Sequence, residues 1–463
     1  MDSFILKDFP FYSEASDVFE LFKDEPFAFL LDSSMRHPLM GRYSFIGFDP
    51  FFVFKHKGNC SLELLRDLFY SYTCYDWPKG IPFPAGIVGY LAYDYGLYQE
   101  NIASSIQVNT FPDCWFGFYD TIIFIDHFCG RIYVSSTGLP EIGYYRQRRA
   151  RDRLGYILNK LSSFYSKDNV YFKNIYSKEI APLDFRSSFS KQQYLAAVNR
   201  ALEYIAAGDI YQVNLSQRLD FNSIDNVEAW DIYKVLRSLS PSCFGGYLDC
   251  GSLKIISSSP ERFICIKDNM VTTRPMKGTR SRASDKCSDM LLKMELENSE
   301  KEKAELLMIT DLERNDIGKV CNYGSVQVSQ LRQIEEYSTV FQATSEITGI
   351  LKKDKDCFDV LHACFPGGSI TGCPKIRAMQ IINELEPVGR FVYTGIMGYI
   401  GFNGDMDFNI LIRTLLSYEN RLEFHVGGGI VADSIPEKEY EETMIKAEAI
   451  RRCLSIVSGL SVK

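Results

Sequence analysis

Short runs of aromatic and β-branched residues, punctuated by Gly, Pro and Asp, are the feature that most limits how this chain can fold. They follow one another closely in three stretches, up to about residue 140, from 210 to 273 and from 395 to 431. Helical periodicity lies elsewhere, for example from Tyr194 to Ala207 and from about Asp285 to Leu312. Strands that succeed one another through short turns pair antiparallel, whereas parallel strands need a long crossover. The pattern therefore predicts an α+β fold built on antiparallel sheets.

The chain divides into two strand-rich halves joined by a polar stretch. Residues 1–140 form the first half and residues 184–463 the second. Between them, 141–183 carries the basic sequence RQRRARDR and a polar tail, which predicts a helical linker. In the second half, MDFNILIRTLL at 406–416 is expected to be one strand, and 285–312 one long helix. With 463 residues, 46% of them hydrophobic, the chain can bury a substantial core.

Charge and composition argue against several classes of protein. The formal net charge is −8 and the pI about 5.4, so no nucleic-acid partner is expected. The N-terminal sequence lacks the pattern of a signal peptide, and no uncharged apolar run approaches the roughly 18 residues that span a membrane. The 13 cysteines are scattered without a C-x-x-C pair, so neither a disulfide framework nor a zinc site is indicated. We expect a soluble, cytoplasmic protein.

The stretch RPMKGT at 274–279 puts a lysine in unusual company for a solubilising charge. Lys277 lies three residues from Arg274 on one side and three from Arg280 on the other. One interpretation is a charge at the end of a strand. The other is a nucleophile, which requires a neutral amine and hence a lowered pKa. Burial would lower the pKa of Lys277, and so would the two arginines if the fold turned them inward. The six residues alone do not decide between a charge at a strand end and a nucleophile.

Two segments with helical spacing carry carboxylates in a matching pattern. Glu302 and Glu305 are three residues apart, and so are Glu439 and Glu442, with Lys446 four further on. Each set shares one helix face. Both could be solvated faces, or the four carboxylates could converge on a cation, for which Mg²⁺ suits an all-oxygen site. The glycine-rich sequences PGGSITG and VGGGIVADS could approach an anion or could be tight turns.

Nine blocks of this chain resemble, in order, the chorismate-utilising enzymes, a family that includes the large subunits of anthranilate synthase and aminodeoxychorismate synthase. The blocks are GDIYQVNLSQR, SSSPERF, RPMKGTRSR, ELLMITDLERNDIG, CFPGGSITGCPKIRAM, YTGIMGYIG, FNILIRT, VGGGIVADS and PEKEYEET. The N-terminal half adds LLDSS, GRYSFIGFDPF, AGIVGYLAYDYG and WFGFYD, which look like the regulatory half of that family. The resemblance covers almost the whole chain. It implies two large, mainly antiparallel β-sheets packed together, with helices on the outside.

Within that family, the position of Lys277 separates two activities. Anthranilate synthases typically read PIAGT there, whereas aminodeoxychorismate synthases read PIKGT. The resemblance implies that Lys277 adds to ring carbon 2 of chorismate as the carbon 4 hydroxyl leaves, and that ammonia then attacks carbon 4 and expels the lysine. Glu261, in SSSPERF, matches the glutamate proposed as the general acid that protonates the departing hydroxyl.

The other implied roles follow position by position. Glu302, Glu305, Glu439 and Glu442 match the acidic Mg²⁺ site of the family, with the ion held against the ring carboxylate of the substrate. The positions that match substrate contacts are Gln212, Gln342, Ser369, Tyr393, Arg413, Gly428, Gly429 and Lys446. Arg413 is a plausible bidentate partner for a carboxylate.

Two glutamines bear on which reaction is expected. Gln212 stands where isochorismate synthases of the family carry a lysine that activates water, so hydration of chorismate is disfavoured. Gln342, in TVFQATSEITG, stands where the family usually has a histidine. Glutamine can donate a hydrogen bond but cannot carry a proton, so an acid or base role at this position is in doubt.

A further set of residues matches the pocket that binds tryptophan in relatives, as an inhibitor or as a structural ligand. These residues are Ser33, Met40, Gly41, Arg42, Tyr43, Cys243, Phe244 and Gly245. Whether this chain binds tryptophan is left open by its sequence.

The expected function is that of an aminodeoxychorismate synthase large subunit, which makes 4-amino-4-deoxychorismate from chorismate and ammonia with Mg²⁺, as a step toward 4-aminobenzoate and folate. No glutaminase motif of the G-x-C-x-G type is present, so the ammonia is expected from a separate glutamine amidotransferase subunit. One alternative is an anthranilate synthase large subunit. Another is an inactive regulatory homologue, for which Gln342 is the only support.

Overall fold

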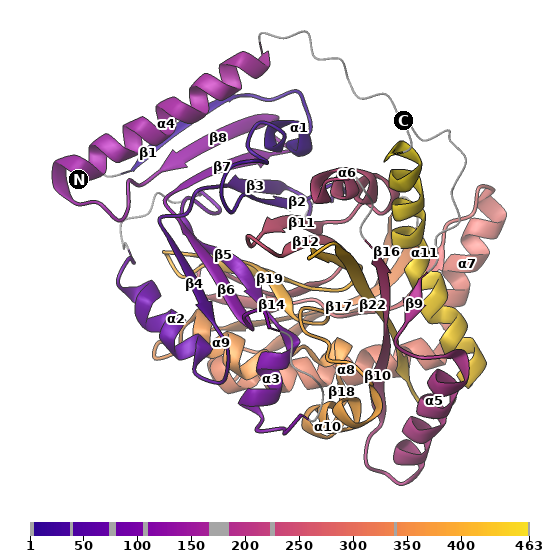
Figure 1. Cartoon of the computed structure of the whole chain (residues 1–463). Coiled ribbons are helices and arrows are strands. Elements are labelled where there is room, and N and C mark those ends of the chain that lie inside the picture. The colour runs from indigo at the N-terminus through magenta and orange to yellow at the C-terminus, as the bar shows by residue number, and fades with distance from the viewer. Residues whose placement is uncertain are drawn as a thin grey trace.

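The segments with strand-like sequence pair into two antiparallel sheets, as Figure 1 shows for the computed structural model. The structure describes residues 4–37, 40–73, 80–104, 110–165, 185–222, 227–337 and 340–461. Within these ranges every pair of neighbouring strands in the two sheets is antiparallel. The predicted α+β class with two large sheets is confirmed.

The first sheet has 12 strands in the described ranges, and the short β9 (Arg186–Ser187) joins it beside β10. Its other members, in spatial order, are β1 (Ile5–Pro10), β8 (Arg131–Ser136), β7 (Thr121–Asp126), β3 (Tyr43–Gly47), β2 (Phe29–Asp32), β11 (Phe244–Asp249), β12 (Lys254–Ser259), β21 (Thr414–Tyr418), β22 (Arg421–Ile430), β10 (Gln212–Asn222) and β18 (Gly372–Cys373).

The second sheet has 10 strands in the described ranges, and β16 (Gln327–Glu336) joins it beside β17. Its other members, in spatial order, are β15 (Met276–Ser281), β17 (Val340–Ile350), β14 (Met270–Thr273), β13 (Arg262–Lys267), β20 (Met406–Ile410), β19 (Ile396–Gly401), β5 (Gly86–Leu91), β6 (Cys114–Tyr119) and β4 (Phe52–His56).

Both sheets contain strands from both halves of the chain. β2 pairs with β11 in the first sheet, and β5 pairs with β19 in the second. A core of large side chains, including Phe29, Tyr90 and Leu416, joins the two sheets, because it draws on β2 and β21 of one and β5 of the other. The two halves of the sequence therefore share their cores.

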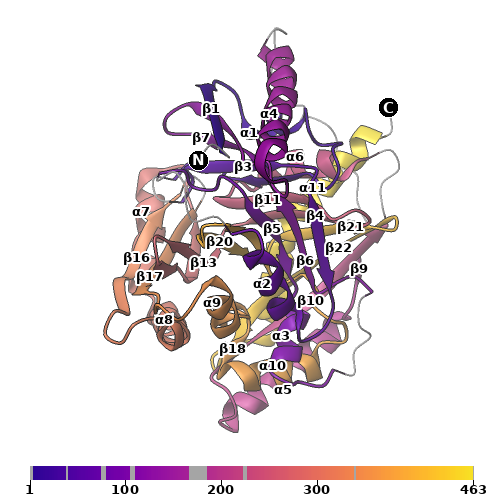
Figure 2. The same cartoon turned by 90° about the vertical axis from the view of Figure 1, so that its left-hand side faces the viewer.

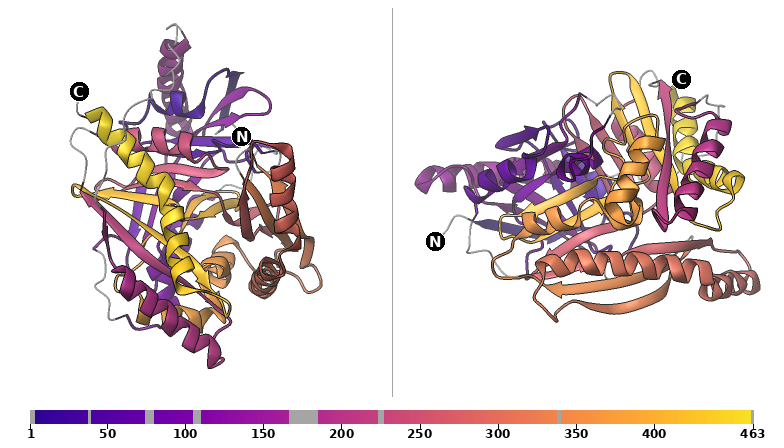
Figure 3. Two further views of the ribbon diagram at one scale, coloured as in Figure 1. Left: turned by 90° about the vertical axis from the view of Figure 1, so that its right-hand side faces the viewer. Right: turned by 90° about the horizontal axis from the view of Figure 1, so that it is seen from below.

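Helices cover the outer faces of the two sheets, in agreement with the prediction. They are α1 (Ala15–Phe19), α2 (Ser61–Tyr70), α3 (Tyr93–Gln99), α4 (Gly143–Tyr165), α5 (Lys191–Ala206), α6 (Ala229–Leu239), α7 (Lys286–Asn298), α8 (Glu300–Val320), α9 (Cys357–Cys364), α10 (Lys375–Leu385), α11 (Pro436–Ser461) and the 3₁₀ turn η1 (Gly368–Ile370). In Figure 2, α7 and α8 stand with β16 and β17 along one edge of the molecule, and Figure 3 shows α11 lying across the face opposite α4. No described helix is both long enough and apolar enough to cross a membrane.

Two predicted elements are each divided in the structure. The long helix expected over 285–312 is two helices, because Ser299 ends α7 and its side chain then accepts the Glu302 backbone N–H as the N-cap of α8. The strand expected over 406–416 breaks into β20 and β21, because Arg413 takes a left-handed backbone with φ of 49°. The linker prediction of 141–183 contains α4, and its part from 166 onward lies outside the described residues.

Candidate active site

A bulge in β15 sets the position of Lys277. Gly278 has a φ of +79°, and the pairing of β15 with β17 shifts register between Lys277 and Thr279. A Cβ built on Gly278 would lie 2.9 Å from the Glu302 carboxyl carbon and 2.8 Å from Leu296 Cδ1, so any larger residue would clash with α7 and α8. The bulge therefore brings Lys277 close to α8, the helix that carries Glu302 and Glu305.

The Lys277 side chain is partly buried, and its amine donates to the Ser369 carbonyl oxygen at 3.2 Å. Burial lowers the pKa of Lys277 below its ordinary value, and the Lys446 ammonium acts in the same direction. The opposing influence comes from the carboxylates of Glu305, Glu261 and Glu442. The lowered pKa increases the fraction of neutral amine, which a nucleophile requires.

The arginines that flank Lys277 in sequence do not act on it, contrary to one of the sequence hypotheses. Arg274 is buried in an ion pair with Glu335, and Arg280 is bonded at 2.8 Å to Glu302. Each guanidinium is therefore neutralised by its own carboxylate. Burial, with Lys446, supplies the lowered pKa that the two arginines were expected to help provide.

Glu261 lies next to Lys277 and is only 4% exposed. Burial raises its pKa to about 7, against the opposing influence of the Lys277 ammonium. Neither Glu261 Oε1 nor Ser369 Oγ has a hydrogen-bond partner among the described residues. A carboxyl with a pKa near neutrality and an unpaired oxygen can donate a proton at physiological pH.

The four glutamates predicted as metal ligands come from α8 and α11. Burial raises the pKa values of Glu305 and Glu439. Neighbouring carboxylates act in the same direction, Glu302 and Glu442 on Glu305, and Glu442 on Glu439. The Glu302 Oε2 atom is buried without a partner in the part of the chain that the structure describes. Across the same ranges no three His, Cys, Asp or Glu side chains lie close enough to hold one metal ion.

This arrangement fits Mg²⁺ in its donor chemistry. Mg²⁺ binds proteins through oxygen, usually by one or two carboxylates, and keeps several waters or substrate oxygens. Glu439 is held by the Ser434 hydroxyl, which donates to Oε1 at 2.7 Å. Glu442 is bonded to Lys446 at 2.7 Å, which brings its pKa below the ordinary value although burial would raise it. Glu302 and Glu442 are already paired with Arg280 and Lys446, so the fit to Mg²⁺ rests on the oxygen donors and not on an unneutralised charge.

The glycines of VGGGIVADS lie on β22, and close approach requires two of them, Gly427 and Gly429. A Cβ on Gly428 would lie 3.5 Å from Glu439 and 3.6 Å from Glu442, and the Lys446 amine donates to the carbonyl oxygen of residue 427. A Cβ on Gly429 would lie 2.9 Å from the Gln212 amide nitrogen. These glycines bring the β22 backbone against the acidic helix on one side and against Gln212 on the other.

Gln212 and Tyr393 form another wall of the site. Gln212 is fully buried, and neither of its amide atoms has a partner within the described ranges. An unpaired buried amide is costly, so its two atoms are suited to a bound ligand. Tyr393 stacks on His425 with ring centroids 5.0 Å apart, and burial raises the pKa of its phenol to about 12. Its hydroxyl therefore stays protonated and can donate to a carboxylate.

Two other predicted contacts have different surroundings. Arg413 is exposed, and the described residues offer its guanidinium no carboxylate partner, so it can receive a carboxylate from outside. Gln342 is bonded through Nε2 to Met276 Sδ at 2.9 Å. Because Ala343 pairs with Lys277, its neighbour Gln342 points to the other face of the strand. The amide of Gln342 thus lies on the side away from Lys277.

The residues predicted as a tryptophan pocket line a separate cavity of about 310 Å³ between the sheets. Ser33, Met40, Arg42, Tyr43, Cys243, Phe244 and Gly245 all line it, and Gly41 does not. A Cβ on Gly41 would lie 2.3 Å from the Met35 carbonyl, so this glycine shapes the turn behind the cavity. The ion pair of Arg262 with Asp407 lines the cavity as well, and no sequence pattern marked it.

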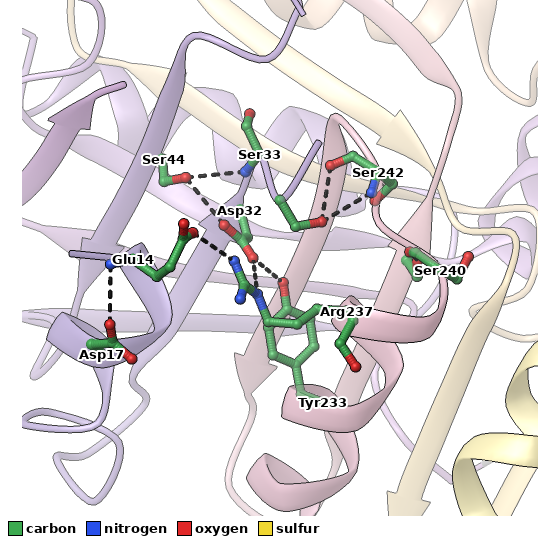
Figure 4. A network of polar contacts seen from close by, with 12 residues as sticks. Glu14, Asp17, Asp32, Ser33, Ser44, Tyr233, Arg237, Ser240 and Ser242 are labelled. Atoms are coloured by element: carbon green, nitrogen blue, oxygen red, sulfur yellow. Dashed lines mark hydrogen bonds and ion pairs between the residues drawn. The ribbon is translucent and has the colours of Figure 1, made fainter. Parts of the chain in front are cut away.

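A buried polar network supports this cavity from one side, and Figure 4 shows Asp32 at its centre. Asp32 accepts hydrogen bonds from Arg237 Nε at 2.8 Å, Tyr233 at 2.9 Å and Ser44 at 3.2 Å. Burial would raise the pKa of Asp32, but Arg237 and these bonds bring it below its usual value. Ser33 donates through its hydroxyl to the Cys243 carbonyl at 3.0 Å, which ties the network to the cavity wall.

Arg390 is a residue that sequence reasoning missed. Its guanidinium donates to the Ile370 and Asn214 carbonyls and lies 5.7 Å from the Tyr393 ring centroid. It thereby holds the segment after Ser369 against β10 and against Tyr393. Its ion pair with Glu386 is local, but the contacts that join it to Ile370, Asn214 and the Tyr393 ring depend on the tertiary fold, so the sequence LEPVGRFVYTG does not distinguish it from a surface charge.

The site combines a buried acid, a partly buried amine, unpaired buried polar groups and carboxylates from two helices. Residues 33–452 match the family model described as chorismate binding enzyme, and the chain belongs to this family.

Its relatives include two activities. The chain is 36% identical over 449 residues to anthranilate synthase component 1 of Aquifex aeolicus, with 93% of this chain and 90% of that protein covered. It is also 36% identical over 459 residues to aminodeoxychorismate synthase component 1 of Bacillus subtilis, with 93% and 94% covered. Among solved structures, anthranilate synthase component I from Streptococcus pneumoniae superimposes with a TM-score of 0.76 at 31% identity, covering 90% of this chain and 93% of that one.

Proposed function

We propose that this protein is the synthase component of aminodeoxychorismate synthase and converts chorismate and ammonia to 4-amino-4-deoxychorismate. The observation that carries the proposal is the Lys277 amine, with its pKa lowered by burial, beside the protonatable carboxyl of Glu261. A lysine at this position gives the site its own nucleophile, which an alanine would not.

The proposed reaction has two displacements. In the first, the Lys277 amine bonds to ring carbon 2, the ring double bonds shift, and the carbon 4 hydroxyl leaves as water with a proton from Glu261. In the second, ammonia bonds to carbon 4 and Lys277 is released, so that the lysine is regenerated and water is the net product lost. Dividing one difficult substitution into two steps is the usual gain of covalent catalysis.

The surrounding residues bind and orient the substrate in this proposal. Arg413 and the protonated Tyr393 hydroxyl are suited to its carboxylates, and the unpaired amide of Gln212 to a ring substituent. Glu302, Glu305, Glu439 and Glu442 would hold Mg²⁺, which would supply positive charge for the ring carboxylate. Ammonia would come from a separate glutamine amidotransferase subunit.

Anthranilate synthase is the second candidate, because relatives of that name match this chain at the same identity as the aminodeoxychorismate synthase. The two are separated by product. The purified chain is incubated with chorismate, Mg²⁺ and ammonium, and the products are identified by mass spectrometry. We expect 4-amino-4-deoxychorismate with its enolpyruvyl ether retained on the ring. Anthranilate with free pyruvate would contradict the proposal, and no turnover at all would support an inactive homologue instead.

A further inference from the structure

A second cavity lies behind Tyr393, between α3 and α10, and neither the proposed reaction nor the tryptophan prediction uses it. Its volume is about 350 Å³, within the range of small-molecule pockets. Most of its wall is apolar or aromatic, with Leu97, Tyr98, Ile382 and Val388 among the lining residues. Its charged lining residues are Asp94, Glu386 and Arg390.

Arg390 and Glu386 neutralise one another, and Arg390 has no donor left. All five N–H donors of Arg390 are used, by Glu386 at 2.9 and 2.6 Å, Ile370 O at 3.0 Å, Asn214 O at 2.6 Å and Thr394 Oγ1 at 3.4 Å. Glu386 accepts in addition from the backbone N–H and the hydroxyl of Ser216. An anionic ligand in this cavity would therefore meet no available cation on the wall.

Asp94 is the charge that remains in the wall without a counter-ion. It is 9% exposed, and its one hydrogen bond in the described structure comes from the Phe391 backbone N–H at 3.2 Å. Lys57 and Arg390 lie near enough to favour its ionised form, but the Lys57 amine is bonded to Asp113 at 3.4 Å and the Arg390 guanidinium to Glu386. A buried carboxylate with no ion pair is expensive, and a bound cation would relieve that cost.

The unpaired polar atoms of the same cavity are also oxygens. The Tyr93 hydroxyl, in a side chain only 2% exposed, has no hydrogen-bond partner within the described ranges, and neither does Asn383 Oδ1. Together with the Asp94 carboxylate these atoms offer acceptors to a ligand that brings donors. A primary ammonium brings three donors and one positive charge.

We propose that the Asp94 cavity is a second ligand site, which takes a primary ammonium ion carried on a small apolar body. The ammonium lies against Asp94, Tyr93 and Asn383, and the apolar body packs on the aromatic and aliphatic wall. This inference stands whichever product the chain makes from chorismate, because none of its argument uses Lys277.

The cavity is connected to the substrate side through one backbone segment. Asp94 bonds to Phe391, and Arg390 lies over the rings of Tyr93 and Tyr393 at 4.9 and 5.7 Å. Phe391 has a left-handed backbone with φ of 49°, and Thr394 one of 61°. Such conformations persist only where the surroundings enforce them, so an amine on Asp94 would act on the segment that carries Tyr393. We expect the amine to change the KM for chorismate more than kcat.

Calorimetric titration of the full chain with 2-phenylethylamine tests the proposal. Phenylacetate and the neutral 2-phenylethanol, of similar size, are titrated in parallel. We expect the amine to bind at least about tenfold more tightly than the alcohol, and the carboxylate to give no binding heat. Equal affinities of amine and alcohol, or preferential binding of the carboxylate, would overturn it, and this comparison needs no variant.

The variant Asp94→Asn locates the site, because asparagine keeps an acceptor for the Phe391 N–H but removes the charge. We expect it to lose at least about tenfold in affinity for the amine, whereas Ser33→Ala, in the wall of the other cavity, keeps wild-type affinity. Thermal unfolding of each variant shows that it is folded at the titration temperature. Unchanged affinity in Asp94→Asn, or loss in Ser33→Ala, would place the amine elsewhere and refute the assignment.

Discussion

Asp32 and Glu261 are two carboxyls of this protein that are almost equally buried, 2% and 4% exposed, yet their pKa values move in opposite directions. Burial acts to raise both. Asp32 nevertheless ends below its ordinary value, because Arg237, Tyr233 and Ser44 all bond to it. Glu261 rises to about 7 because no comparable set of donors reaches it.

The difference shows how one fold makes a structural carboxylate and a reactive carboxyl. Asp32 has hydrogen-bond donors around it, so its negative charge is stabilised and it joins β2 to α6 beside the 310 Å³ cavity. Glu261 has fewer donors around it, so it can still exchange a proton near neutral pH, and its neighbour Lys277 can lose one more easily than an exposed lysine. Perturbed pKa values of this kind gather at functional sites.

The substitution Lys277→Ala is expected to have the largest effect on the reaction. It removes the nucleophile, so we expect formation of 4-amino-4-deoxychorismate to fall by at least about 10³-fold. Product formation is followed by chromatography and mass spectrometry with saturating ammonium.

Lys277→Arg is the matched control, because it keeps a positive charge at the site but cannot provide a neutral amine. The proposal predicts that this variant is as inactive as the alanine. Substantial activity in Lys277→Arg would mean that Lys277 acts by charge alone, and the covalent step would have to be abandoned.

Glu261→Gln keeps the shape of the side chain and removes the acid proton of the carboxyl. We expect kcat to fall by about 10²- to 10³-fold. In the wild type the protonated form is lost as pH rises through about 7, so kcat should decline above that pH, and the residual activity of the glutamine variant should not show this decline. A decline of equal size in both proteins would assign it to a group other than Glu261.

Asp32→Asn tests the structural side. The variant leaves the Arg237 guanidinium without its buried carboxylate, and removing one partner of such a pair costs about 3 kcal/mol of unfolding free energy. Because the folded-state pKa of Asp32 is lowered, its stabilisation is present above its unfolded value and is lost as pH falls through the folded pKa. The gap between wild type and variant in urea unfolding should therefore close in acid.

Glu261→Gln is the matched control in the same unfolding experiment. Its raised pKa means that the free-energy cost of this carboxyl in the fold grows as pH rises from its ordinary pKa to about 7 and is complete above that, so the variant should be at least as stable as the wild type at pH 8. If Glu261→Gln lost as much stability as Asp32→Asn, the contrast between the two carboxyls would fail.

A smaller effect is expected at the carboxylates predicted to hold Mg²⁺. Ser434→Ala removes the hydroxyl that orients Glu439 at 2.7 Å, and the Mg²⁺ concentration for half-maximal rate should rise by about tenfold. Initial rates are measured against Mg²⁺ after treatment with a chelator. A wild-type rate that the chelator does not reduce would contradict the magnesium prediction itself.

The sequence predicted the fold class because alternation and turn residues act locally, and the helix expected from Tyr194 to Ala207 is found as α5, from Lys191 to Ala206. It did not predict the break at Arg413, because a left-handed backbone at an arginine is enforced by tertiary contacts. It could not predict which groups act on Lys277 either. Arg274 and Arg280 are close in sequence but are paired with other carboxylates, whereas Lys446 comes from a distant helix.

The candidate site could be predicted only in part, because tertiary contacts decide which groups meet there. Spacing put Glu302 with Glu305 and Glu439 with Glu442, but only the tertiary fold brings charges from both helices to Lys277. Asp94 has no local signal, since its hydrogen-bond partner Phe391 lies 297 residues away in the sequence.

The central claim is that Lys277 forms a bond to the substrate, and the most direct measurement is the intact mass of the protein after incubation with chorismate and Mg²⁺ in ammonia-free buffer. The account predicts a mass increase equal to chorismate minus water, located on Lys277 by peptide mapping and absent from Lys277→Arg. Adding ammonium should discharge it as 4-amino-4-deoxychorismate. An unmodified Lys277 in a protein that still forms 4-amino-4-deoxychorismate when ammonium is added would contradict the account.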